Sequence, residues 1–174
     1  MRNILLTTAL AFALPTGLLA AGGGDEKAPE KPKCENGQVY DKTTKTCTDA
    51  KDSRLNDLDR YETLRALAHA GRYTEAQTVL AAMPQDDDRT LTYLGFTTRK
   101  LGDTAGGMAY YTAALAQNPG NILARSYMGQ ALVEQGQMAQ ALAQLREIRS
   151  HGGSGTWAEA SLRNAIATGR GSSY

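Results

Sequence analysis

The feature that most constrains this chain is an internal repeat with a period of 34 residues. When Gly102 is aligned with Gly136, Leu94–Gly95 falls on Met128–Gly129. An earlier and weaker copy places Gly71 31 residues before Gly102, three residues short of the period. A repeat of this length indicates similar units that stack side by side, because one such unit cannot bury its apolar face alone.

Each unit is predicted to consist of two antiparallel helices. Small residues are needed where two helices cross closely, and Gly95 and Gly129 meet this need in the first helices of their units. Ala76, Gly107 and Ala141 meet it in the second helices. Glycines tolerate the left-handed conformation that ends a helix. The glycines expected to end the first helices are Gly71, Gly102 and Gly136.

We expect six helices in the array and a seventh after it. The six predicted ranges are 54–70, 73–83, 89–101, 104–117, 122–135 and 138–149. The segment 156–169 carries Trp157, Leu162 and Ile166 on one side, as expected of a helix that closes the end of a solenoid. Trp157 is interpreted as a core residue. The acidic run Asp86–Asp88 precedes a helix directly and is interpreted as its N-terminal cap rather than a cation site.

The repeat resembles the tetratricopeptide family, whose signature is W-x-x-L-G-x-x-Y, then A-x-x-x-F, then P. The matching residues of the weak first copy are Leu67, Gly71, Tyr73, Ala76 and Leu80. Those of the second copy are Leu91, Leu94, Gly95, Thr98, Gly107, Tyr111 and Pro119. Those of the third copy are Arg125, Met128, Gly129, Leu132, Ala141 and Leu145. The resemblance implies an all-α fold, a short helical solenoid of about three helix pairs plus a C-terminal capping helix. A small disulfide-closed loop is expected to precede it.

Residues 1–20 have the layout of a secretory signal peptide, with one basic residue, an apolar run over 4–14, and then Pro15 and small residues. A membrane-spanning helix is the alternative, but the run is shorter than the ~20 residues that a bilayer core needs. We expect cleavage after Ala20 or Ala21, and no stable membrane span after signal cleavage. The expected location is the periplasm, with secretion or tethering by an uncleaved signal as alternatives.

Residues 21–53 are expected to form a flexible linker that contains a loop between Cys34 and Cys47. The linker begins with alternating charges and two prolines over 25–33, which offer nothing to bury. In an exported protein the two cysteines are most simply explained as a disulfide. The pattern C-x-x-G-x-V-Y-D also resembles part of small chitin-binding modules, which implies envelope carbohydrate binding as an alternative function, with the repeats as a spacer. The remaining boundaries are 54–168 for the repeat domain and 169–174 for a tail.

The sequence lacks recognisable catalytic motifs, so we expect no enzyme. It has no G-x-S-x-G, no H-E-x-x-H and no phosphate-binding glycine loop. His69 and His151 have no ligand partners at helical spacing, and the cysteines lack metal-site spacing, so neither a metal nor another cofactor is expected. The chain has 19 Lys and Arg against 18 Asp and Glu, and a formal charge of +1 does not favour nucleic acid.

In the tetratricopeptide family the first helices of the pairs line a concave groove, and the resemblance implies that this groove binds a protein or peptide partner in the cell envelope. The groove positions carried over are Tyr61, Arg65, His69, Arg89, Thr92, Phe96, Arg99, Lys100, Ser126, Gln130 and Glu134. We expect the first half of the groove to be basic, with Tyr61 and Phe96 as aromatic anchors. The alternatives are that these are merely solvated helix faces, and that the protein self-associates through its repeat ends.

Overall fold

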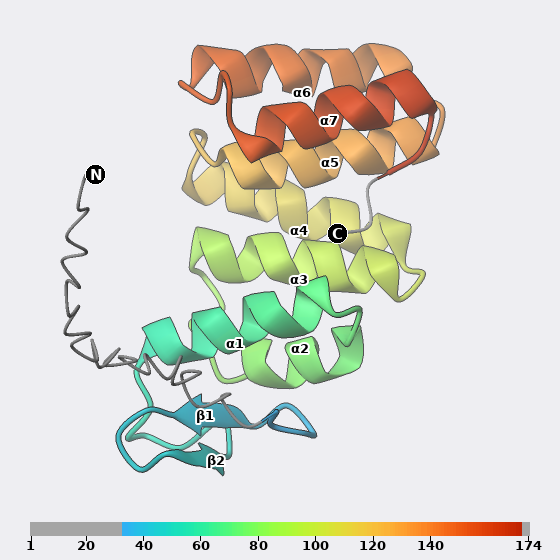
Figure 1. Ribbon diagram of the computed structural model, residues 1–174. Helices are drawn as coiled ribbons and strands as arrows, with labels where there is room; N and C mark the ends of the chain where they lie inside the picture. The colour runs from blue at the N-terminus through green and yellow to red at the C-terminus, as the bar shows by residue number, and fades with distance from the viewer. Residues whose placement is uncertain (1–32, 172–174) are drawn as a thin grey trace, which may run out of the picture. The chain divides into compact units, whose positions relative to one another are not determined.

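The computed structural model, which describes residues 33–171, is a stack of helix pairs that follows a small hairpin (Figure 1). The helices are α1 (Asp57–His69), α2 (Tyr73–Leu80), α3 (Asp88–Lys100), α4 (Thr104–Gln117), α5 (Ile122–Glu134), α6 (Met138–Ser150) and α7 (Trp157–Thr168). Each helix contacts the next one in the chain, and α5 also contacts α3 and α7. The helical solenoid with a single final helix is therefore confirmed. The predicted signal peptide lies outside the described residues.

Side-chain caps explain where the helices begin. Helix α1 begins three residues later than expected because Asn56 caps it, accepting a hydrogen bond from the backbone nitrogen of Asp59 at 2.9 Å. Asp87 accepts from the backbone nitrogens of Arg89 and Thr90, so the acidic run before α3 is a cap as predicted. Removing such a cap typically costs about 1 kcal/mol.

The ends of the first helices follow the glycine positions of the repeat. Gly71, Gly102 and Gly136 have φ angles of 73°, 105° and 73°, in the region that other residues adopt only with strain. Helix α2 ends at Leu80, three residues before the predicted end, because the chain turns through backbone hydrogen bonds from Ala82 to Val79 and from Met83 to Leu80.

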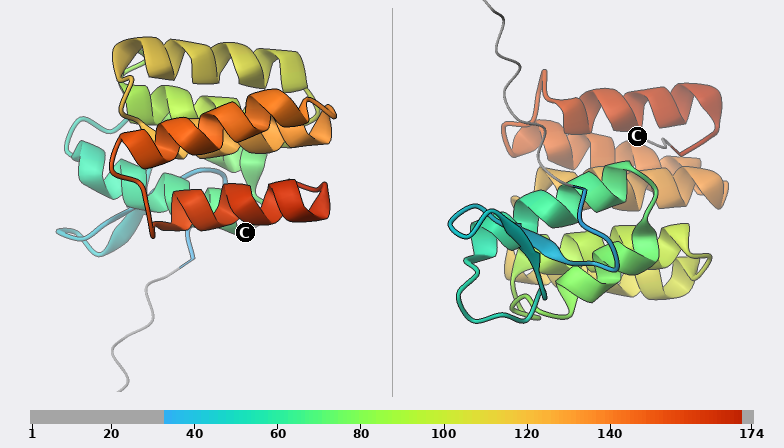
Figure 2. Two further views of the ribbon diagram at one scale, coloured as in Figure 1. Left: turned by 90° about the horizontal axis from the view of Figure 1, so that it is seen from above. Right: turned by 60° about the horizontal axis from the view of Figure 1, so that its bottom comes forward.

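Aromatic side chains fill the core between the two helix layers. Tyr93, Phe96, Tyr111 and Tyr127 are all at most 2% exposed. Burying an aromatic or aliphatic side chain of this size contributes roughly 1.5–3 kcal/mol each. Figure 2 (left) shows α4 and α7 on opposite sides of the stack, so the two helix layers present different surfaces.

A two-stranded antiparallel hairpin stands where the cysteine loop was expected. Its strands are β1 (Val39–Asp41) and β2 (Thr46–Thr48), paired with Val39 opposite Thr48. The Cys34–Cys47 disulfide closes it, as the sequence predicted.

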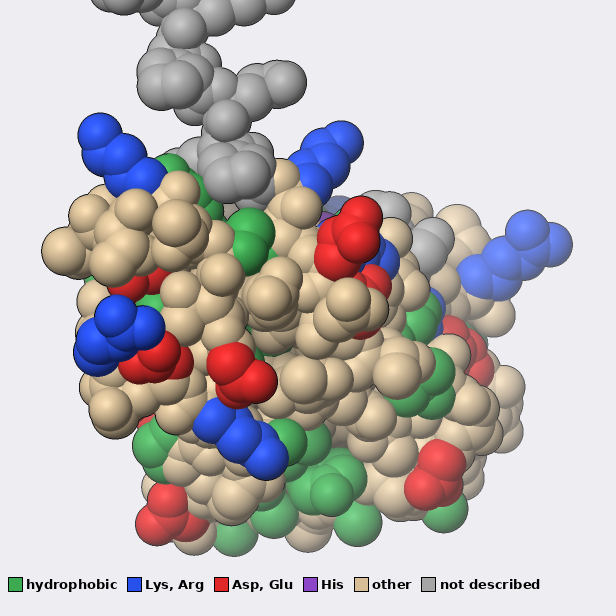
Figure 3. Space-filling view, turned by 90° about the horizontal axis from the view of Figure 1, so that it is seen from below, with side chains coloured by type: hydrophobic (Ala, Val, Ile, Leu, Met, Phe, Trp, Pro, Cys, Tyr) green, Lys and Arg blue, Asp and Glu red, His purple; other side chains and the backbone are tan. Residues whose placement is uncertain are grey.

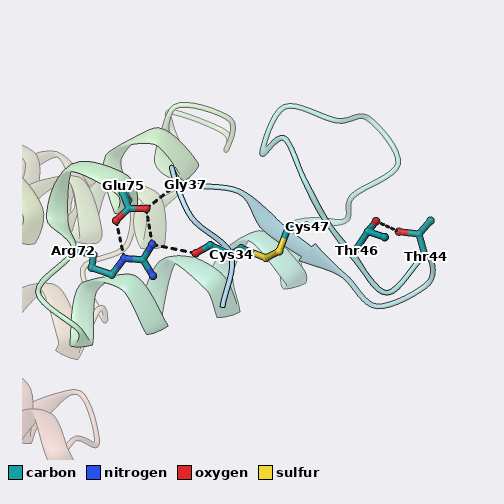
Figure 4. The surroundings of a disulfide bond; sticks show 7 residues. All are labelled: Cys34, Gly37, Thr44, Thr46, Cys47, Arg72 and Glu75. Atoms are coloured by element: carbon teal, nitrogen blue, oxygen red, sulfur yellow. Dashed lines mark hydrogen bonds and ion pairs between the residues drawn. A yellow bond between two sulfur atoms is a disulfide. The ribbon is translucent and has the colours of Figure 1, made fainter. Parts of the chain in front are cut away.

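The hairpin is docked onto the first helix pair (Figure 4). Arg72 donates to the backbone oxygen of Cys34 at 3.0 Å, and Glu75 accepts from the backbone nitrogen of Gly37 at 3.2 Å. Val39 is fully buried in the same cluster as the residues of α1 and α2. The expectation of a flexible linker therefore does not hold for residues 33–53, because these contacts give the loop a core that it lacks alone.

The surface at the hairpin end carries intermixed acidic and basic side chains (Figure 3). Lys42, for example, lies 2.8 Å from Asp59 and 3.0 Å from Glu62. This face therefore presents no single-sign field. Within the described residues, no helix is both long enough and apolar enough to cross a bilayer.

Candidate interaction groove

A hollow lies over the first helices of the pairs, where α1, α3, α5 and the start of α7 come together. It has a volume of about 250 Å³. Its walls are Tyr61, Arg65 and His69 from α1, Tyr93 from α3, Leu123 and Tyr127 from α5, and Trp157 from α7. We call it the aromatic pocket. It contains no carboxylate in its lining, which makes it a surface for an apolar group beside a cation.

The rings of the aromatic pocket contact one another from helix to helix. Tyr61 meets Tyr93 edge to face at 5.8 Å between ring centroids. Tyr93 meets Tyr127 at 6.3 Å, and Tyr127 meets Trp157 at 6.1 Å, both also edge to face. Such pairs add about 0.5–1.5 kcal/mol each beyond area burial. The rings therefore hold a fixed apolar surface that spans four helices.

A second hollow of about 300 Å³ adjoins the first and is lined by the starts of α3 and α5. Asn121 donates to Asp88 at 2.7 Å and to Thr92 at 3.0 Å, which fixes the polar wall between the two helices. We call it the polar pocket. Tyr61 and Leu123 line both pockets, so the two form one continuous channel, which we call the interaction groove.

Two guanidinium groups flank the ring of Tyr61. Arg65 lies 6.0 Å and Arg89 5.5 Å from the ring centroid, within cation–π range. Burial, assisted by the charge of Arg65, lowers the pKa of His69 below its usual value. Burial also raises the pKa of Tyr93 to about 12. Both shifts belong to a partly desolvated surface with a positive charge at its edge.

Comparison with known proteins identifies the family. Residues 99–156, from the end of α3 to the residue before α7, match the family model described as tetratricopeptide repeat. The chain is a tetratricopeptide-repeat protein. No curated protein and no solved structure matches it. Repeats of this family generally serve as non-catalytic scaffolds for protein–protein interaction, and the match supports that general role.

The tetratricopeptide groove brings five of the eleven predicted positions together. These are Tyr61, Arg65, His69, Arg89 and Thr92, although Thr92 itself is fully buried. Lys100 and Glu134 lie elsewhere, at the far ends of α3 and α5. Lys100 is 5.8 Å from the ring of Phe96, and its pKa is lowered, first by burial and then by Arg99. Their binding roles stay predictions.

Phe96 and Arg99 are buried, so they cannot serve as the anchor and cation of an open groove in this structure. Phe96 is 1% exposed and packs against Tyr73 and Tyr127 at 5.8 and 4.7 Å. Arg99 is 5% exposed and forms an ion pair with Glu134 at 2.6 Å. Both residues hold α3 to its neighbours.

Ser126 and Gln130 are covered by α7. Ser126 donates to the backbone oxygen of Ala158 at 2.8 Å, and Gln130 donates to Ser161 at 3.1 Å. Both side chains are fully buried. The groove therefore does not extend along α5, because the capping helix occupies that surface.

Four lining residues were missed as groove positions by sequence reasoning, namely Tyr93, Leu123, Tyr127 and Trp157. Tyr93 and Tyr127 stand 34 residues apart, so the repeat itself places them at equivalent positions and could have revealed them. Trp157 was interpreted as a core residue, and that was wrong. It is 48% exposed because it opens α7 at the rim of the groove.

Ionisable residues do not gather into a metal site in the part of the chain that the structure describes. No group of three or more His, Cys, Asp or Glu side chains lies close enough there to hold an ion. The chemistry on offer is that of a binding surface: an apolar wall, guanidinium groups, and fixed hydrogen-bonding side chains.

Proposed function

We propose that this protein is a non-enzymatic, exported scaffold that binds a segment of a protein partner in the interaction groove. The observation that carries the proposal is the continuity of the two pockets through Tyr61 and Leu123. An extended segment can lay an apolar side chain on the aromatic wall while its polar groups reach the neighbouring pocket. Buried aromatic anchors of this kind supply most of the affinity in many interfaces.

Export to the periplasm is part of the proposal and rests on two observations. The layout of residues 1–20 is that of a signal peptide. The disulfide between Cys34 and Cys47 is of a kind that persists in oxidising compartments and is rare in the cytosol. Fusing residues 1–24 to a reporter that is active only after export tests this location. An inactive fusion would contradict it.

Photocrosslinking in cells tests the groove. Tyr61 is replaced by a photoreactive phenylalanine analogue, which keeps an aromatic ring in the groove. Leu142, which is 40% exposed on α6, receives the same analogue as the matched control. We expect a defined adduct from position 61 that is absent from position 142. Equal adducts at both positions, or none at position 61, would count against a partner in the groove.

Carbohydrate binding by the cysteine loop is the second candidate. It is favoured by a hollow of about 260 Å³ between the hairpin and α1, whose lining includes Tyr40, Gln38, Asp59 and Glu62. An aromatic ring beside carboxylate and amide groups suits a sugar. The full-length protein and its Tyr40→Ala variant are compared for retention on chitin and on peptidoglycan. Equal retention of the two would remove this candidate.

Self-association through the C-terminal end of the array is the third. A hollow between α6 and α7 is lined by Leu145, Ile166 and Ala167, and Leu142 is exposed on α6 nearby in the chain. Light scattering of the protein and of Leu142→Glu tests this surface. A monomeric mass for both would exclude it.

A further inference from the structure

The ligand chemistry of the interaction groove can be narrowed further, on the condition that the groove is the binding site as proposed above. We infer that it recognises an extended protein segment in which a large apolar or aromatic side chain stands next to a carboxylate. The apolar side chain occupies the aromatic pocket, and the carboxylate pairs with Arg65. The following contacts carry this inference.

Arg65 is the cation of the aromatic pocket, and it has no acidic counterpart. Among residues 33–171, no carboxylate lies within ion-pair distance of Arg65, whose side chain is exposed. Arg89, the other guanidinium beside Tyr61, is already paired with Asp87 at 3.2 Å. A carboxylate from a ligand therefore gains more at Arg65 than at Arg89.

The Tyr61 ring holds the Arg65 guanidinium beside the apolar wall. The group lies 6.0 Å from the ring centroid, and it interacts with the hydroxyl of Tyr93 as well. A guanidinium placed in this way loses less side-chain entropy when it forms hydrogen bonds to a carboxylate. Charge-assisted hydrogen bonds of this kind are about twice as strong as neutral ones.

The two ends of the groove differ in charge, which favours a peptide over a polyanion. Arg65 and His69 stand at one end, whereas Asp88 stands in the polar pocket at the other. A phosphate chain running along the groove would meet the carboxylate of Asp88. A peptide with a single acidic residue at the Arg65 end avoids this repulsion.

Four short synthetic peptides that share one Gly/Ser frame test the inference. They carry Phe-Asp, Phe-Asn, Ala-Asp or Phe-Lys at the centre. Binding to the full-length protein is measured by fluorescence anisotropy of a dye on the peptide. We expect Phe-Asp to bind most tightly. Exchanging Asp for Asn should weaken binding about tenfold, the effect of losing one charge-assisted hydrogen bond. Exchanging Phe for Ala should weaken it by at least about tenfold.

Variants of the protein separate this inference from the proposed function. Arg65→Met keeps the length of the side chain and should abolish the preference for Asp over Asn while Phe is still preferred over Ala. Arg146→Met, an exposed arginine on α6 outside the groove, is the matched control and should change neither preference.

Each outcome has a definite meaning. If the peptides bind and Tyr61→Ala weakens them, but Asp and Asn bind equally, the groove stands and the carboxylate rule is overturned. If Tyr61→Ala leaves binding unchanged, the groove itself is overturned. If none of the four peptides binds to the folded protein, the inferred ligand class is overturned, whereas the photocrosslinking experiment still decides whether the groove holds a partner.

Discussion

At the scale of single residues, the crossing of α3 and α4 depends on two glycines that face each other. A Cβ atom at Gly95 would lie 2.6 Å from the ring of Tyr111 and 3.0 Å from the backbone oxygen of Gly107. Tyr111 is fully buried and cannot move aside. Gly95→Ala gains about 1 kcal/mol of helix propensity but overpacks the crossing by roughly 1–3 kcal/mol. We expect a net loss of about 1 kcal/mol in the free energy of unfolding, measured in urea.

A double-mutant cycle checks that the overpacking is the cause. Tyr111→Leu removes the ring that the new methyl group would meet. The free energy lost in the double variant should therefore be smaller than the sum of the two single losses, by about 1 kcal/mol. Additive losses would show that Gly95→Ala acts elsewhere.

The need for small residues at these positions was predictable from the sequence, but the neighbour that uses the space was not. Gly95 meets the helix of its own pair, as expected. A Cβ atom at Gly129 would instead lie 2.6 Å from Leu162 of α7. The repeat shows that the position must be small, whereas the helix that fills the space depends on how the last helix docks.

Residues on one predicted face also divide between core and surface in a way that the sequence does not show. Arg65 and Arg99 were both assigned to the groove, and only Arg65 lies there. Arg99 is buried between the ring of Phe96 at 5.9 Å and the carboxylate of Glu134 at 2.6 Å. A buried arginine needs such partners, and these come from a helix 35 residues away.

At the scale of elements, the hairpin closes the N-terminal end of the array, as α7 closes the other. It buries Val39 against the first helix pair and is fixed through Gly37. The sequence predicted the disulfide and the turn but not this docking, because the contacts join Gly37 to Glu75 and Cys34 to Arg72 across 38 residues. Lys-rich composition around the loop indicated a solvated linker and hid the buried face of β1.

Gly37→Ala should undock the hairpin. Gly37 has a φ of 73° and a Cβ atom there would lie 2.6 Å from Cβ of Thr78. Gly71→Ala is a close control, since Gly71 has the same φ of 73° with nothing within 4 Å. Both variants carry a left-handed strain of about 1–2 kcal/mol. Only Gly37→Ala adds a clash, which we expect to cost roughly a further 1–3 kcal/mol.

Hydrogen exchange of the β1 and β2 amides measures this undocking. We expect those amides to lose protection in Gly37→Ala and to keep it in Gly71→Ala. Equal protection in the two variants would mean that the hairpin is held by the disulfide and its own strands, without the contact at Thr78.

At the scale of the whole molecule, a chain of tyrosine rings connects the helix pairs. Tyr93, Tyr111 and Tyr127 are buried between layers, and the contacts continue to Tyr61 at one end and Trp157 at the other. Tyrosine ionisation thus couples the stability of the array to alkaline pH. Burial raises the pKa of Tyr93 and of Tyr111 from 10.0 to about 12, although the charge of Arg99 opposes the rise at Tyr111.

The sign of the effect follows from which state holds the proton more tightly. The folded state keeps these phenols protonated to a pH of about 12, whereas the unfolded chain releases the protons at about 10. Stability is therefore full below pH 10 and is lost as the pH rises from about 10 through about 12. At pH 11 the loss should be on the order of 1 kcal/mol for each tyrosine.

Urea unfolding at pH 9 and pH 11 tests this coupling in the protein and in the Tyr93→Phe, Tyr111→Phe double variant. Phenylalanine keeps the ring in the core but cannot ionise, so the double variant should lose about 2 kcal/mol less than the parent between the two pH values. Tyr40→Phe, on the half-buried face of the hairpin, is the control and should match the parent. If the double variant loses as much as the parent, the alkaline sensitivity arises from surface groups, and the rings contribute through packing alone.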